Sequence, residues 1–72
     1  MMMSYKKLWK LLIDRDMKKK ELCALAGVSS TSIAKMGRNE NVNTEILVKI
    51  CEALECDISE IAEIVNDNRE EE

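Results

Sequence analysis

The hydrophobic positions of this chain recur every three or four residues over most of its length, which is the spacing of amphipathic helices. The first such stripe predicts a helix that has Ser4 as its N-cap and ends near Asp14. Its apolar face consists of Tyr5, Leu8, Leu11 and Leu12. A later stripe predicts another helix, capped by Asn43 or Thr44. It consists of Leu47, Ile50, Cys51 and Leu54.

Two shorter helices are predicted between these stripes, from about Lys18 to Ala26 and from Ser29 to about Met36. Gly27 separates them and can take the positive φ that ends a helix, whereas Gly37 is a natural stop for the second. Ser29 can cap the second helix, and Val28 can pack between the two helices. Buried positions are expected at Leu22, Ala26, Ile33 and Met36.

A fifth helix is predicted near the end of the chain. Asp57 and Glu60 have capping-box spacing, and Ile58, Ile61 and Val65 share a helix face. The three methionines at the start are too short a run to indicate an element. We therefore predict an all-α, five-helix domain over residues 1–66, followed by an acidic, frayed tail at 67–72.

Composition narrows the possible functions. The 72 residues include no proline, no histidine and two glycines, so the commonest general base and metal ligand is missing. The chain also has no glycine-rich phosphate loop. We predict that the protein is not an enzyme, and we predict no cofactor and no small-molecule ligand.

The cysteines and the hydropathy favour a reduced, cytoplasmic protein. Cys23, Cys51 and Cys56 are an odd number without CxxC spacing, so we expect thiols that pack as small hydrophobes and no metal site. A redox-active pair of Cys51 and Cys56 is the alternative. No apolar run is as long as a membrane span or a signal-peptide core.

Charge divides the chain into a basic and an acidic part. Residues 1–40 carry nine cations against four anions, and residues 41–72 carry two cations against ten anions. One face can therefore attract phosphate while the other repels it. Ordinary solvated faces are the alternative interpretation.

The segment from Lys18 to Arg38 has residue types that suit a DNA-binding surface. Cations precede its first helix, and the second helix begins with the small hydroxyl residues Ser29 to Ser32. Small polar side chains flanked by cations are well suited to entering a DNA groove. Solvated lysines and simple capping chemistry are the alternatives.

This pattern resembles the Cro/repressor-type (XRE-like) helix-turn-helix domains of bacteria and phages, which have the lambda-repressor-like fold. The resemblance rests on Leu22, Ala26, Gly27, Val28, Ser29, Ile33 and Met36, and on Leu47, Ile50, Leu54, Ile58 and Ile61 downstream. It covers about Tyr5 to Val65. It implies that the predicted helix from Ser29 enters the major groove of double-stranded DNA.

The resemblance also implies roles for individual residues. Positions matching the family's base contacts are Ser30, Thr31, Ser32 and Lys35. Positions matching its phosphate contacts are Lys18, Lys19, Ser29, Arg38, Asn39, Asn41 and Asn43. The end of the chain commonly builds a homodimer in this family, and here it presents Ile61, Ile64 and Val65. Trp9, off the main stripe, either packs at the domain edge or marks a partner surface.

The chain departs from the family at two points. Members often pair an arginine with a glutamate at the positions that Leu12 and Gly37 occupy here; losing both partners together costs little. Serine and threonine also lack the bidentate geometry of arginine or glutamine. We therefore expect modest direct readout, with Lys35 toward guanine and Thr31 toward a thymine methyl, and DNA shape supplying the rest.

Two functions remain open from the sequence. The first is a sequence-specific transcriptional regulator, most simply a repressor, encoded by a bacterium or phage. The second is a protein-interaction module that retains the fold, such as an antitoxin or an anti-repressor partner. The basic half of the chain favours the first, and the acidic half leaves room for the second.

Overall fold

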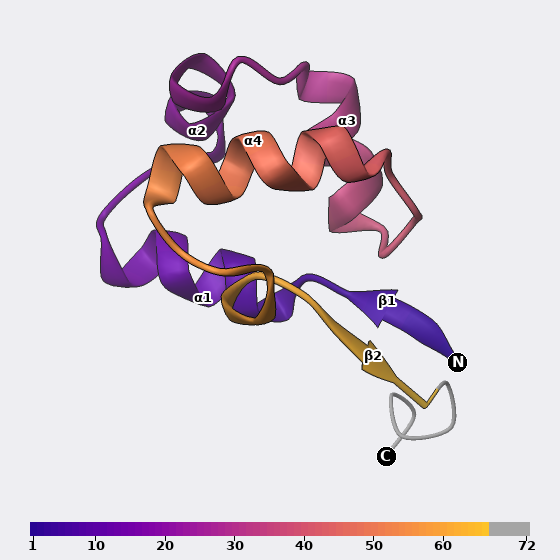
Figure 1. Cartoon of the computed structure of the whole chain (residues 1–72). Helices are drawn as coiled ribbons and strands as arrows, with labels where there is room; N and C mark the ends of the chain where they lie inside the picture. The colour runs from indigo at the N-terminus through magenta and orange to yellow at the C-terminus, as the bar shows by residue number, and fades with distance from the viewer. Residues whose placement is uncertain (67–72) are drawn as a thin grey trace.

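The computed structural model describes residues 1–66, which form four α-helices, a short 3-10 helix and two short strands (Figure 1). The α-helices are α1 (Lys6–Asp14), α2 (Lys19–Ala26), α3 (Ser30–Gly37) and α4 (Thr44–Leu54). The 3-10 helix η1 (Ile58–Glu60) follows α4. The strands are β1 (Met2–Ser4) and β2 (Glu63–Val65). The predicted acidic tail at 67–72 lies outside the described residues.

The helices enclose one hydrophobic core, as the apolar periodicity predicts. Leu8 and Leu12 of α1, Leu22 of α2, Ile33 and Met36 of α3 and Leu47, Ile50 and Leu54 of α4 are all buried. Each such side chain contributes about 1.5–3 kcal/mol through burial. Tyr5, Val28, Ile61 and Ala62 complete the core. Leu11 and Ala26 are only half-buried at its edge.

Most of the predicted helix boundaries are confirmed. Gly27 has a φ of 70° and ends α2, where its N–H donates to the Cys23 carbonyl at 2.9 Å. Asn43, one of the two predicted caps, accepts the Glu45 N–H at 2.7 Å. The helix α3 ends at Gly37, the predicted stop, and Asn39, two residues later, has the positive φ of 59°.

The predicted fifth helix is wrong. Asp57 and Glu60 do form the expected capping box, but they cap only the single turn of η1. The chain then extends into β2, which pairs antiparallel with β1 so that Met3 lies opposite Ile64. A helix this short is marginal, and the β-branched Ile64 and Val65 favour a strand once another strand is available.

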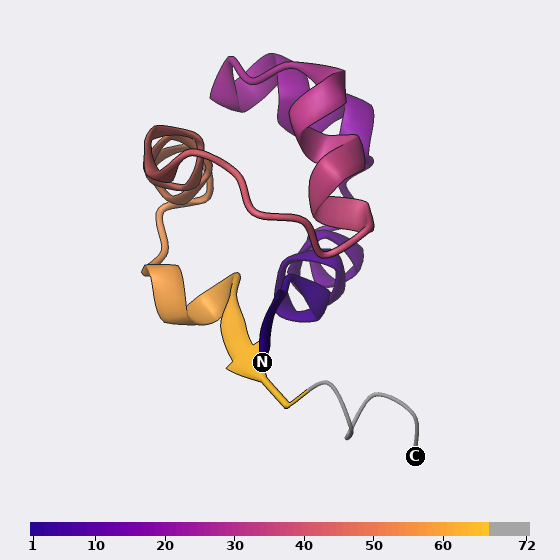
Figure 2. The same cartoon turned by 90° about the vertical axis from the view of Figure 1, so that its right-hand side faces the viewer.

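The strand that pairs with β2 is formed by the start of the chain, which differs from two expectations. Met2 and Met3 belong to β1, so the methionines do form an element. Ser4 is not the N-cap of α1, because the helix begins one residue later, after Tyr5. Ser4 is instead fully buried, and its Oγ accepts the Lys6 N–H at 3.5 Å. Figures 1 and 2 both show the two strands side by side and away from α2.

Candidate nucleic-acid interface

The two central helices and the turn between them form a rigid bihelical unit. Gly27 reverses the chain, and Val28 is buried in the core beneath the turn. The Ser29 Oγ accepts the Ser32 N–H at 3.1 Å and so caps α3. An N-cap of this kind contributes about 1 kcal/mol to helix stability. The turn therefore sets the angle at which α3 leaves α2.

The outer face of α3 presents most of the predicted base-contacting residues. Ile33 and Met36 are buried and fix the inner face of the helix. Ser30, Thr31 and Lys35 are exposed on the other side. Ser32 differs, because it is half-buried and its Oγ lies 3.0 Å from the Ser29 Oγ. Its hydroxyl is therefore engaged in the cap, which leaves three predicted base contacts on the exposed face.

The start of α2 carries three consecutive lysines, all exposed. The Lys18 N–H donates to the Glu21 carboxylate at 2.8 Å, which satisfies one backbone donor of the helix start. The Lys19 ammonium lies 4.5 Å from the centroid of the Trp9 ring on α1. Lys19 and Lys20 border a hollow of about 420 Å³ between α2 and α3, which Ser30 and Gly37 also line. The predicted phosphate contact at Lys19 therefore lies near Ser30, one of the predicted base contacts on α3.

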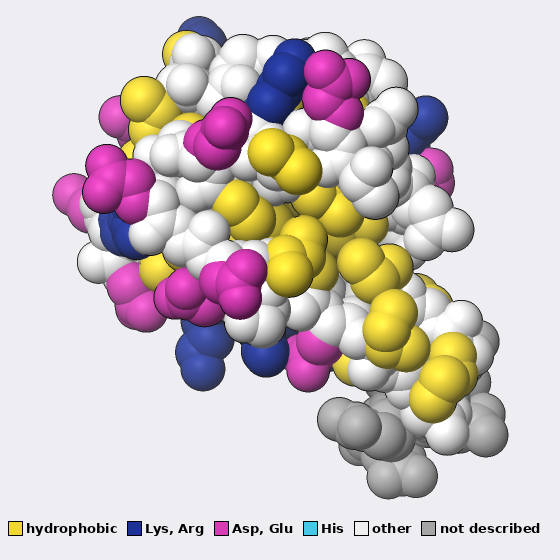
Figure 3. Space-filling view, in the orientation of Figure 1, with side chains coloured by type: hydrophobic (Ala, Val, Ile, Leu, Met, Phe, Trp, Pro, Cys, Tyr) yellow, Lys and Arg dark blue, Asp and Glu magenta, His cyan; other side chains and the backbone are white. Residues whose placement is uncertain are grey.

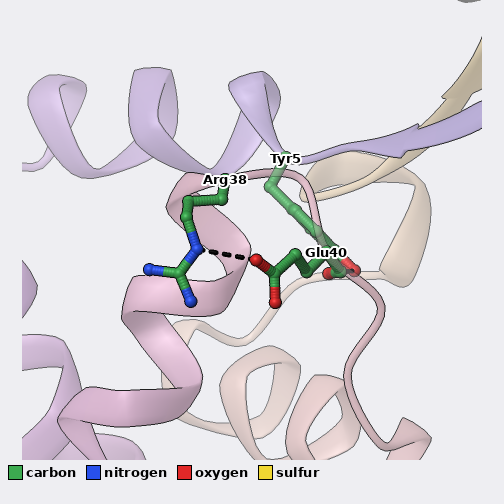
Figure 4. A network of polar contacts seen from close by, with 3 residues as sticks. All are labelled: Tyr5, Arg38 and Glu40. Carbon is green, nitrogen blue, oxygen red and sulfur yellow. Dashed lines mark hydrogen bonds and ion pairs between the residues drawn. The ribbon is translucent and has the colours of Figure 1, made fainter.

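The segment after α3 places Arg38 in an ion pair that the sequence analysis did not predict. The Arg38 Nε donates to the Glu40 carboxylate at 2.7 Å, and the two side chains are 59% and 48% exposed (Figure 4). The hydrogen bond from Arg38 lowers the pKa of the Glu40 carboxyl, and the same bond raises the pKa of Arg38. A phosphate that approaches Arg38 therefore competes with a neighbouring carboxylate.

Tyr5 anchors this segment to the start of α1. Its hydroxyl donates to the Glu40 carbonyl at 3.1 Å, and its backbone N–H donates to the Asn39 Oδ1 at 3.4 Å. Burial raises the pKa of Tyr5, so the phenol stays protonated and able to donate. The segment that carries Arg38 is thus held against the core at two points.

The three asparagines predicted to contact phosphate have different roles in the fold. Asn39 accepts the bond from Tyr5, and Asn43 caps α4. Asn41 is exposed between them. A side-chain amide whose oxygen accepts a hydrogen bond from a backbone N–H still has its NH₂ group available. Phosphate oxygens accept hydrogen bonds from donors of this kind. All three are therefore chemically able to donate to phosphate.

The predicted dimer residues lie at the end of η1 and in β2. Ile61 and Val65 are 0% and 6% exposed and pack inside the chain itself, whereas Ile64 is 59% exposed on β2. Of the three, Ile64 is the side chain that the monomer presents to a second molecule.

Two features of this surface were not predicted from the sequence. Trp9 and Lys19 lie on different helices, and no local spacing links them, so only the packing of α1 beside α2 could reveal their contact. The ion pair of Arg38 and Glu40 could have been predicted, because the two opposite charges are only two residues apart in the sequence. Over residues 1–66 no group of three or more acidic, cysteine or histidine side chains is arranged to hold a metal ion. None of the helices described is long and apolar enough to cross a membrane.

Comparisons with known proteins agree with this geometry. The model of the Cro/C1-type HTH DNA-binding domain family matches residues 7–67. A solved structure, described as the crystal structure of transcriptional regulator VanUg, form II, superposes with a TM-score of 0.87. It is 55% identical to this chain, and the match covers 92% of this chain and 88% of that one. A search of the curated proteins gave no match.

Proposed function

Because this chain belongs to the Cro/C1-type helix-turn-helix family of DNA-binding domains, we propose that it is a transcriptional regulator that binds double-stranded DNA sequence-specifically. The observation that carries this proposal is the exposed face of α3, where Ser30, Thr31 and Lys35 point away from the buried Ile33 and Met36. In this function α3 enters the major groove and those three side chains meet base edges.

The lysines at the start of α2 supply the electrostatic part of the binding. Lys18 and Lys19 are exposed at the start of α2, where Lys19 shares a hollow with Ser30 of α3, and Arg38 follows the end of α3. Contacts from these cations to phosphates release counterions and position the domain without reading sequence. Lys35, a single ammonium, favours guanine O6 and N7, and the methyl of Thr31 favours thymine.

We further propose that the protein binds as a homodimer through its strand end. The exposed Ile64 on β2 supports this arrangement, as does the neighbouring Met1, which is 85% exposed. In the described chain the sheet has two strands, so each has a strand partner on one side only. A two-fold pair would place two copies of α3 in successive major grooves about one helical turn apart. A dimer bound in this way at a promoter would block RNA polymerase, so the regulator would act as a repressor.

The test is a selection from the genome that encodes the protein. Purified protein is incubated with fragments of that genome at physiological salt, and the retained fragments are sequenced. We expect enrichment of a short inverted repeat whose half-sites lie about one helical turn apart. Retention without any shared sequence, vanishing as salt rises, would show that the binding is nonspecific and would contradict the proposal.

A further inference from the structure

An open hollow of about 630 Å³ lies where α4 ends and η1 begins. Its apolar lining consists of Val48, Cys51, Cys56 and Ile58. Its polar lining consists of Glu52, Glu55, Asp57 and Glu60. The hollow therefore combines an apolar floor with carboxylates only, since no lysine or arginine lines it.

The apolar floor is open to solvent. Val48 is 55% exposed and Ile58 is 44% exposed, although both are large hydrophobic side chains. Figure 3 shows apolar side chains running across the face that α4 presents, with acidic side chains gathered where the helix ends. Contiguous apolar surface with a polar rim is typical of sites that bind another protein.

The carboxylates give the hollow a negative potential. Burial raises the pKa of the Cys51 thiol to about 11, and the charges of Asp57 and Glu60 act in the same direction. The pKa of Cys56 is also raised, by burial first and then by Glu60, while Arg15, which does not line the hollow, acts in the opposite direction. A negative potential repels DNA and attracts a cationic partner.

The hollow is separate from the candidate DNA interface. Its lining comes from α4, η1 and the residues between them, and includes none of the predicted base or phosphate contacts. A molecule bound there leaves the outer face of α3 and the lysines of α2 accessible. The site is thus suited to a partner that binds together with DNA.

A second copy of the chain does not match this surface. A two-fold contact through the hollow would bring the four carboxylates of one copy against the same four of the other. Like charges placed together across an interface are strongly unfavourable. A partner that fits this hollow must therefore supply apolar side chains to its floor and positive charge to its acidic rim.

We propose that this hollow, formed by the end of α4 and by η1, binds a basic amphipathic segment of a partner protein. Apolar side chains of the segment pack against Val48 and Ile58. Its lysines or arginines pair with the carboxylates of Glu52, Glu55, Asp57 and Glu60. Apolar anchors surrounded by complementary charge are the usual arrangement of a helix bound in a groove.

The probe for this proposal is a synthetic amphipathic helical peptide of leucine and lysine, added to the full-length ¹⁵N-labelled protein. Its counterpart has glutamate in place of every lysine. We expect the lysine peptide to shift the backbone amide signals of Val48, Cys51 and Ile58 most strongly, and the glutamate peptide to shift none of them. Shifts spread evenly over acidic residues elsewhere would overturn the proposal.

Two pairs of variants sharpen the result. The double variant Glu52→Lys/Glu55→Lys should weaken peptide binding about tenfold or more, because it reverses two rim charges. Glu63→Lys reverses one exposed acid on β2, outside the hollow; it is the control and should bind normally. Val48→Ser should also weaken binding, whereas Ile13→Ser, which changes a 75% exposed isoleucine on α1, should not.

The same spectra test the competing occupant. If the Val48, Cys51 and Ile58 signals move with protein concentration in the absence of peptide, a second copy covers the hollow and the proposal is wrong. Equal weakening by the rim variant and by Glu63→Lys would also overturn it. Thermal unfolding confirms that each variant is folded, and all the substituted side chains are exposed.

Discussion

The side-chain ammonium of Lys19 lies 4.5 Å from the centroid of the Trp9 ring. Trp9 is half-buried on α1, and Lys19 is the exposed first residue of α2. A cation over the face of an indole is attracted by the negative charge density of the ring. The contact therefore restrains a flexible side chain at a position where we propose a phosphate contact.

Trp9→Leu should weaken DNA binding about two- to fivefold, since a restrained lysine loses less entropy on meeting phosphate than a mobile one. In a Lys19→Ala background the same substitution should have no further effect. Fluorescence anisotropy of a labelled duplex at low salt measures both. Trp9→Phe retains an aromatic face and should weaken DNA binding less than Trp9→Leu does. An equal loss in both backgrounds would mean that Trp9 acts through packing alone.

Lys19 and Lys35 should differ in what they contribute to DNA binding. Lys19→Ala should weaken binding to all sequences and lower the slope of log K against log salt by about one, because one phosphate contact is lost. Lys35→Ala should instead change which sequence is preferred. Titrations at several salt concentrations, followed by selection from a random duplex library, measure these effects. Lys49→Ala, an exposed change on α4, is the control. A change in sequence preference with Lys19→Ala would contradict the assignment.

The Arg38–Glu40 ion pair should be sensitive to acid. Arg38 lowers the pKa of the Glu40 carboxyl, so any stability from the pair is present above the usual glutamate pKa of about 4.3 and is lost as pH falls through the lowered value. A ¹³C titration of the Glu40 carboxyl should show a midpoint below the usual one. Arg38→Ala should return it toward that value. An unchanged midpoint in this variant would show that the pair does not form.

Removal of the Glu40 charge should also affect DNA binding. Glu40→Gln leaves Arg38 without a competing carboxylate, so a phosphate can engage the guanidinium more readily. We expect tighter binding at low salt, measured by anisotropy against the unchanged protein. Arg38→Ala/Glu40→Gln should abolish that gain. A gain that persists without Arg38 would reflect only the general loss of a negative charge.

The N-terminal strand should be needed for full stability. A chain that begins at Ser4 after its start methionine lacks most of β1, so β2 loses its partner and the core around Ile61 and Val65 loses cover. We expect a loss on the order of 2 kcal/mol in the free energy of unfolding. Urea denaturation measures it. Ile13→Ala, at a 75% exposed side chain on α1, should have little effect on stability and is the control. Full stability in the shortened chain would show that the sheet contributes nothing.

Much of the fold was predictable because the determinants are local. Helix periodicity places Leu8, Leu22, Ile33 and Ile50 in the core, and all four are buried. Gly27, the residue with the lowest cost at positive φ, lies where α2 ends. Ser29 and Asn43 cap the helices that follow them. The family's motif positions further indicate which exposed residues of α3 are candidate base contacts.

The sequence by itself therefore determined the apolar faces of the helices and the turn between α2 and α3, because both depend on residue spacing within one segment. It also determined the basic and acidic halves, because charge depends on composition alone. Only the tertiary structure decided the features that join distant segments. Ile64 and Val65 form a strand because the chain's first residues lie beside them. The contact of Trp9 with Lys19 and the hollow at the end of α4 arise in the same way. Pairings of this kind depend on long-range packing, which local propensity does not encode.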